Sequence, residues 1–145
     1  MKKIFLLLIL ILLLCINIAV AAPVQITSNA VDHYWLHSAP GLNTIVYSTY
    51  LTGPPTWEDQ VVKDVRGGGS ATAIGTVDNS YPDINTNGDI VYVGGDGEIY
   101  KYVGSTETQL TSSGYSKYNP DTCPDNTYAV YWADNGSGYN HIYIE

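Results

Sequence analysis

The chain has 145 residues, with 14 acidic and six basic side chains, a formal charge of −8, and 13 tyrosines against one phenylalanine. This acidic excess disfavours binding to a nucleic-acid backbone, because few cations are available to displace its counterions. The length is sufficient for one modest domain with a hydrophobic core.

Residues 1–21 have the features of an export signal. Lys2 and Lys3 precede an almost unbroken Leu/Ile run over residues 4–16, and Ala19-Val20-Ala21 has the small-x-small pattern of a cleavage site. We expect cleavage after Ala21 and a protein that is secreted, periplasmic or attached to the cell surface. The alternative is an uncleaved anchor, in which case this segment alone would contact the membrane.

The remaining residues contain one plan three times, in residues 23–50, 70–95 and 106–134. Each copy starts with a polar/apolar stretch, passes through a Ser/Asn/Asp loop to a tyrosine, turns, and enters a Val-Tyr strand. The tyrosines of the Val-Tyr pairs, Tyr47, Tyr92 and Tyr131, are 45 and 39 residues apart. Such a period is typical of a four-stranded propeller blade, for which about 40–45 residues is usual.

The local patterns predict strands and tight turns throughout the three copies. Val, Ile, Tyr, Thr and Trp alternate with polar residues in short runs, and no helical period follows the leader. A further strand recurs at residues 57–65, 98–103 and 140–145. Tight hairpin turns are expected at Asn87-Gly88, Asp96-Gly97 and Asn135-Gly136, because these residue types tolerate positive φ.

Four segments between residues 97 and 134 also resemble a known family. GEIYKY (97–102), TETQLT (106–111), YNPD (118–121) and AVYWAD (129–134) are similar to the third, outermost, innermost and second strands of TolB-like, WD-type (PD40-like) β-propeller repeats in exported bacterial and archaeal cell-surface proteins. The resemblance covers residues 24–145. It implies antiparallel blades around a central channel and a function in protein interaction rather than catalysis. The first innermost strand, HYWLHSAP (33–40), departs most from the family pattern.

We therefore predict an all-β, propeller-type fold of about three four-stranded antiparallel blades. The blade-like units are expected at residues 28–75, 76–111 and 112–145, and the strand at 24–27 is expected to complete a last blade. Closed propellers have at least four blades. We therefore expect either a partial propeller, as in a fragment of a longer surface protein, or a homodimer in which strand exchange closes a six-bladed ring.

The sequence predicts no catalytic, cofactor-binding or metal-binding residues. It has no Gly-x-Ser-x-Gly motif. His33 and His37 are expected on one face of a strand about 13 Å apart, too far to share one ion. The loops at 94–98 and 134–138 contain oxygen donors without the spacing of an EF-hand, which favours ordinary hairpin turns over a calcium site.

The predicted function is an exported, non-catalytic binding or scaffold module whose partner is a protein, a peptide or a cell-surface polymer. Trp57, Trp132 and Tyr139 lie at or beside the loops between the second and third strands, and they are the candidate contact residues because aromatic side chains provide large binding areas. The alternative is an accessory propeller fragment of a secreted hydrolase, either a peptidase or a carbohydrate-active enzyme.

Overall fold

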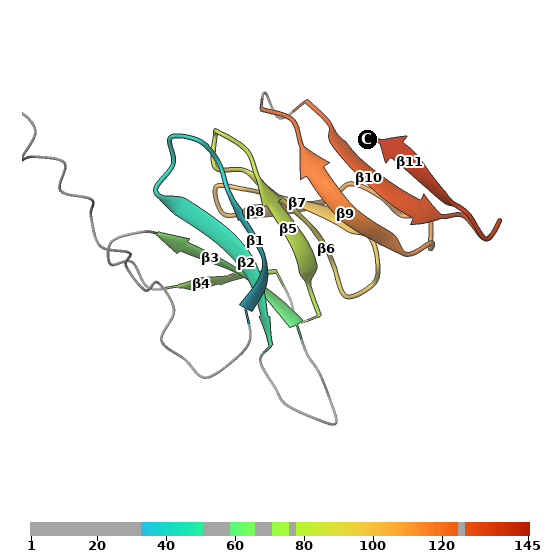
Figure 1. The fold of residues 1–145 in the computed structure, drawn as a ribbon, viewed down its shortest axis with the longest axis horizontal. Helices are drawn as coiled ribbons and strands as arrows, with labels where there is room; N and C mark the ends of the chain where they lie inside the picture. Colours follow the sequence, from blue (N-terminus) through green and yellow to red (C-terminus); the bar gives the residue numbers. More distant parts are fainter. Residues whose placement is uncertain (1–32, 51–58, 66–70, 76–77, 125–126) are drawn as a thin grey trace, which may run out of the picture.

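A computed structural model describes residues 33–50, 59–65, 71–75, 78–124 and 127–145. These residues form three antiparallel sheets, which follow one another across the molecule (Figure 1). The first sheet contains β1 (His33–Ser38), β2 (Thr44–Tyr50), β3 (Asp59–Val65) and β4 (Thr72–Ile74). The second contains β5 (Ser80–Ile84), β6 (Ile90–Val93), β7 (Ile99–Val103) and β8 (Thr106–Gln109). The third contains β9 (Lys117–Thr122), β10 (Ala129–Asp134) and β11 (Asn140–Ile144).

The prediction of an all-β chain with antiparallel sheets is confirmed for this part of the protein. Its third sheet has three strands, whereas we expected about four in each unit. The described residues include no helix that could cross a membrane. The leader at 1–21, the strand predicted at 24–27 and the candidate contact Trp57 lie outside the described residues.

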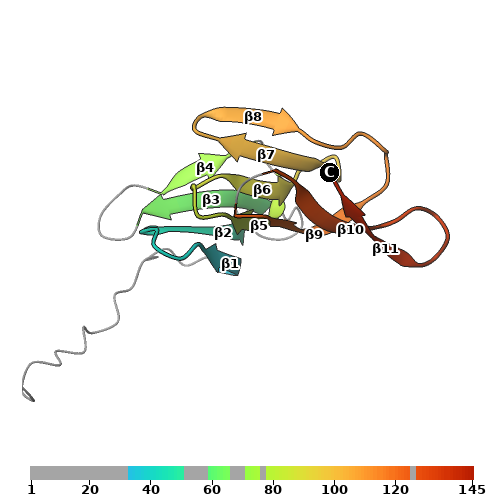
Figure 2. The same ribbon diagram turned by 90° about the horizontal axis from the view of Figure 1, so that it is seen from above.

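Within each sheet the strands pair in the order of the chain. In the turned view of Figure 2, the outermost strands β4 and β8 lie on one side of the molecule and β1 lies on the other. Strand β5 contacts β1, β2 and β3, and β9 contacts β5 and β6. The second sheet therefore lies between the first and the third, and the first strands of the three sheets are neighbours.

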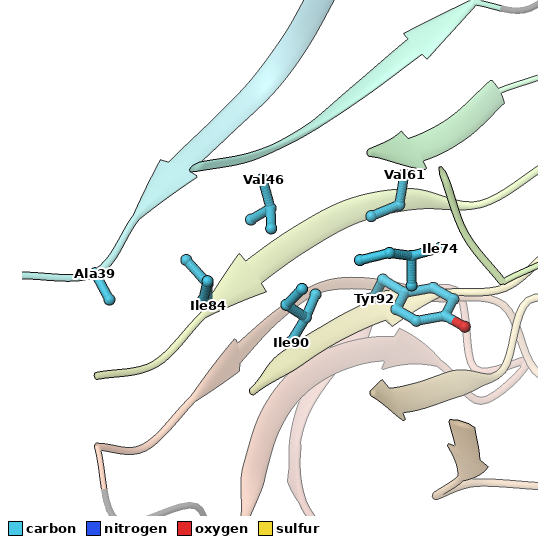
Figure 3. Packing of buried hydrophobic residues seen from close by; sticks show 7 residues of the cluster. All are labelled: Ala39, Val46, Val61, Ile74, Ile84, Ile90 and Tyr92. Carbon is cyan, nitrogen blue, oxygen red and sulfur yellow. The ribbon is translucent and has the colours of Figure 1, made fainter. Parts of the chain in front are cut away.

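Two hydrophobic cores lie between the sheets, and the side chains of β6 point alternately into one and the other. On β6, Ile90 and Tyr92 point toward the first sheet, and Val93 packs with the third. Figure 3 shows the first core, in which these two residues meet aliphatic side chains of the first sheet such as Val46 and Val61. Side chains at successive strand positions point to opposite faces, so β6 contributes to both cores.

The second core is smaller and joins the second sheet to the third. Val93 and Ile99 pack against Tyr131 and Ala133 of β10, and all four are buried. The Val-Tyr tyrosines are equivalent in the repeats, and Tyr47, Tyr92 and Tyr131 are all buried on the middle strands of their sheets. Tyrosine burial in this protein thus follows from the repeated position.

The far face of the third sheet is different, because the described chain places no further sheet on it. Val130 and Trp132 are half-buried there, while Ile142 and Ile144 are exposed by 79% and 67%. The residue equivalent to Ile142 in the second sheet is Ile99, which is completely buried. This face therefore repeats the apolar pattern of an internal face without its covering layer.

Candidate binding site on the inner strands

The first strand of every sheet has a β-bulge at the same place. The register shifts between Tyr34 and His37 in β1, between Ser80 and Asp83 in β5, and between Tyr118 and Asp121 in β9. A bulge adds one residue to one strand and turns the local backbone. The divergent segment HYWLHSAP thus forms the same bulged strand as the other two copies.

In each bulge two residues lie opposite one residue of the neighbouring strand. The first of the two has a positive φ, of 50° at Trp35, 53° at Tyr81 and 45° at Asn119. Asparagine tolerates this left-handed region, but bulky aromatic residues seldom adopt it. Such a conformation costs about 1–3 kcal/mol and persists only where the surrounding structure enforces it. The three bulges therefore store strain at equivalent positions of neighbouring strands.

The bulges bring three polar side chains together, namely His37, Asp83 and Asp121, which occupy equivalent positions in β1, β5 and β9. The Nδ1 atom of His37 lies 3.0 Å from Oδ1 of Asp83. The backbone N–H of Thr122 donates to Oδ2 of Asp83 over 2.9 Å. Asp83 thereby connects all three inner strands.

The two carboxyl groups of this cluster also interact directly. Asp83 and Asp121 are close enough to hydrogen-bond when one of them is protonated. Burial, and then the hydrogen bond and charge of Asp83, raise the pKa of Asp121 above its ordinary value, while His37 acts in the opposite direction. The cluster thus contains two carboxyl groups and a single imidazole.

The expectation that His33 and His37 share one strand face is wrong. His33 pairs with Thr49 and His37 pairs with Val46, so the bulge between them reverses the alternation. The ring of His33 packs edge-on against Tyr47 at 5.0 Å, on the face opposite that of His37. One extra residue in a strand exchanges the faces of all later side chains.

Aromatic rings form a continuous row along the inner strands and across all three sheets. Successive ring centroids are 3.9 to 6.1 Å apart, and the closest pair is Trp35 with Tyr81. The rings, in order, are Tyr50, Tyr34, Trp35, Tyr81, Tyr118 and Trp132. Aromatic pairs at such distances stabilise one another and offer flat apolar surfaces to a ligand.

A hollow of about 310 Å³ lies between the row and the polar cluster. Trp35 and Tyr81 line it, as do Pro82 and Pro120 and the His37, Asp83 and Asp121 side chains. Concave sites with aromatic walls and a few convergent polar groups are typical of ligand binding. This hollow is our candidate functional site.

Trp132 and Tyr139, the two candidate contacts within the described residues, do not line this hollow. Trp132 lies within β10 and stacks on Tyr118 at 4.4 Å, at the far end of the aromatic row. Tyr139, which is 75% exposed, lies between β10 and β11. The residues that sequence reasoning missed had a detectable signal, because Pro-Asp occurs at 82–83 and again at 120–121, each time directly after a Tyr or Asn.

The acidic side chains in the two turns that we considered for calcium have structural partners. Oδ1 of Asp96 accepts the N–H of Glu98, and the hydroxyl of Tyr100 donates to Oδ2. Oδ1 of Asp134 accepts two backbone N–H groups of its own turn, those of Gly136 and Gly138. The carboxylates of Asp96 and Asp134 therefore stabilise their own turns.

No protein-family model matches this chain, and none of the curated proteins matches it. The residues of the inner strands therefore have to be interpreted from their own geometry and chemistry.

Proposed function

We propose that the chain is an exported, non-catalytic, propeller-type binding module that holds a protein or peptide partner on the surface formed by β1, β5 and β9. The observation that carries this proposal is the convergence of three equivalent bulges on one hollow. Strained left-handed residues are often found at ligand-binding sites. Here they present an aromatic row and a polar cluster from three separate sheets.

The geometry of the carboxyl pair supports binding rather than glycoside hydrolysis. A glycosidase keeps its two carboxyl groups roughly 5 Å or more apart, so that a sugar carbon or a water fits between them. Asp83 and Asp121 lie within hydrogen-bonding reach of each other. A partner is therefore expected to lie on this pair and on the rings beside it.

The aromatic surface can be tested without disturbing the bulges. Asn119 shows that asparagine fits the left-handed position, so Trp35→Asn with Tyr81→Asn removes two rings and keeps the backbone. Arrayed 12-residue peptides probed with the purified protein should yield a reproducible set of ligands that the double variant binds at least about tenfold more weakly, since one lost hot-spot contact costs about 2 kcal/mol. Tyr115→Asn is the control, because this exposed ring lies outside the hollow.

Two outcomes of the array would contradict the proposal. One is that no peptide is bound above background by the folded protein. The other is that the double variant keeps the same peptides at the same strength while its melting temperature is unchanged.

We also propose that a second copy of the chain adds residues 24–27 to the outer edge of β11. In support, the third sheet has three described strands where the others have four, and among the described residues β11 pairs with β10 alone. Open edges favour strand addition. The six-bladed ring expected from the repeats requires this pairing twice.

Native mass spectrometry tests the assembly and the leader together. A dimer of subunits that begin at residue 22 is expected, and Ile26→Pro should convert it to monomers because proline removes a ladder N–H. A wild-type protein that stays monomeric at high concentration would exclude the strand exchange.

A further inference from the structure

The hollow on the inner strands has an excess of negative charge. With both carboxylates ionised, Asp83, Asp121 and His37 together carry −2 or −1, depending on the imidazole. His37 has half of its side chain exposed, so water weakens its attraction for the carboxylates. No lysine or arginine is among the described residues that line the hollow.

Of the two carboxylates in the cluster, Asp121 is the more exposed to solvent. His37 occupies one oxygen of Asp83 and the N–H of Thr122 occupies the second. Although the residue as a whole is exposed, partial burial of the Asp121 carboxyl, followed by the hydrogen bond and charge of Asp83, disfavours its ionised form. A positive group placed at Asp121 would remove that repulsion and gain a charged hydrogen bond.

The aromatic wall is suited to the same kind of group. The Trp35 ring lies 4.5 Å from that of Tyr34 and 3.9 Å from that of Tyr81, and the residue is 39% exposed, so part of the indole is open to solvent. The faces of tryptophan and tyrosine attract cations. Guanidinium is planar, stacks on aromatic faces and binds a carboxylate through two parallel hydrogen bonds.

We infer that the hollow binds one cationic side chain of the peptide partner, with arginine preferred over lysine. This inference rests on the proposed function. The guanidinium stacks on Trp35 and donates to Asp121. A volume of about 310 Å³ fits a single side chain, because it is at the lower limit of the roughly 300–1,000 Å³ of small-molecule sites.

Aromatic walls with carboxylates also occur in sugar-binding sites, but the charge of this hollow favours a cation. A neutral sugar cannot relieve the repulsion between Asp83 and Asp121, whereas a guanidinium does so directly. The test below therefore includes a sugar as the competing ligand.

The experiment is an NMR titration of the full chain at pH 7 with the capped tripeptide acetyl-Gly-Arg-Gly-amide. The signal to follow is the indole N–H of Trp35, assigned with Trp35→Phe. We expect saturable shifts of this signal, and at least about tenfold weaker binding of the same tripeptide with citrulline, which is nearly isosteric and neutral. Chitotetraose is titrated in parallel as the sugar probe.

Asp121→Asn and Glu145→Gln make a matched pair of variants, since each removes one negative charge and Glu145 does not line the hollow. Asp121→Asn should weaken arginine binding about tenfold, and Glu145→Gln should leave it within about twofold. Equal effects of the two variants would mean that only overall charge matters, which would overturn the inference.

The remaining outcomes separate this inference from the proposed function. Shifts with chitotetraose but not with the arginine peptide overturn the inference in favour of a sugar. Peptides selected on the array without an arginine or lysine preference overturn the inference and leave the binding function standing. An array that yields no ligand overturns both.

Discussion

Lys117 is one of six basic residues, yet only 1% of its surface is exposed. Its Nζ lies 2.5 Å from Oε2 of Glu98 and donates to the carbonyl of Tyr115 over 2.6 Å. Glu98 also accepts from the hydroxyl of Thr111 and the N–H of Gly114. This buried pair joins the start of β9 to the start of β7, so a residue that the sequence marks as a surface charge is part of the sheet-to-sheet junction.

Removing one partner of this pair should destabilise the fold more than removing both charges. Lys117→Met leaves a buried carboxylate without its cation, and the expected loss in free energy of unfolding is about 3–5 kcal/mol. Lys117→Met combined with Glu98→Gln should lose clearly less. Urea denaturation measures both, and a double variant that is as unstable as the single one would contradict this account.

The same carboxyl group predicts how stability depends on pH. Burial alone would raise the pKa of Glu98, but the hydrogen bonds from Lys117, Thr111 and Gly114 outweigh it, and the pKa is lowered. A lowered pKa in the folded state stabilises the fold above the unfolded value of about 4.5, and this contribution disappears as the pH falls through the folded value. The urea concentration at the unfolding midpoint should therefore decrease as the pH is lowered below about 4.5. The decrease should be less steep in Glu98→Gln than in the wild type.

Two glycines in left-handed conformation provide a matched steric test. Gly41 has a φ of +80° with no atom within 4 Å of an added Cβ, whereas at Gly75 (φ +70°) that Cβ would lie 2.5 Å from Nδ2 of Asn79 and 2.6 Å from the hydroxyl of Tyr92. Gly41→Ala should lower the free energy of unfolding by about 1–2 kcal/mol through backbone strain. Gly75→Ala should lower it by ~1–3 kcal/mol more than Gly41→Ala, because both of its neighbours are buried. Equal losses in thermal unfolding would show that the buried neighbours move freely.

At the scale of the elements, the inner strands are held together by Asp83 rather than by a shared ladder. Asp83→Ala removes the carboxylate that accepts the N–H of the buried Thr122 over 2.9 Å, and it removes the ion partner of His37. The expected loss is about 1–3 kcal/mol. Asp121→Asn should not destabilise the fold, because the charge of Asp121 is unfavourable beside Asp83.

Amide hydrogen exchange distinguishes these two variants. Asp83→Ala should reduce the protection of the Thr122 N–H, and Asp121→Asn should keep it. If both variants keep full protection, Asp83 does not fasten β9 to β5.

At the scale of the whole molecule, equivalent apolar positions of the sheets can differ in whether another sheet covers them. Ile99 is fully buried and Ile142 is 79% exposed. In the single subunit, Ile99→Asp should therefore lower the free energy of unfolding by more than ~3 kcal/mol, while Ile142→Asp should change it by less than about 0.5 kcal/mol. Equal, large losses in dilute solution would mean that the far face of the third sheet is covered in the folded protein.

Much of the architecture could be predicted because it depends on local patterns. Alternation, turn residues and the repeated Val-Tyr pairs specify antiparallel strands, and the order of hairpins follows from the order of the repeats. The candidate site was largely missed because local patterns do not show which residues of different repeats come together. His37, Asp83 and Asp121 belong to three different repeats, and a bulge changes which way a side chain points without changing the alternation of the sequence.

The amino-acid sequence by itself determined the strand content, the threefold repeat and the recurrence of Tyr47, Tyr92 and Tyr131, because each depends on residues near one another in the chain. Only the tertiary structure decided that His37, Asp83 and Asp121 meet, that Lys117 is buried against Glu98, and that Ile142 is exposed where Ile99 is not. These features depend on how one sheet lies against the next. That packing is set by long-range contacts between repeats, which no local pattern records.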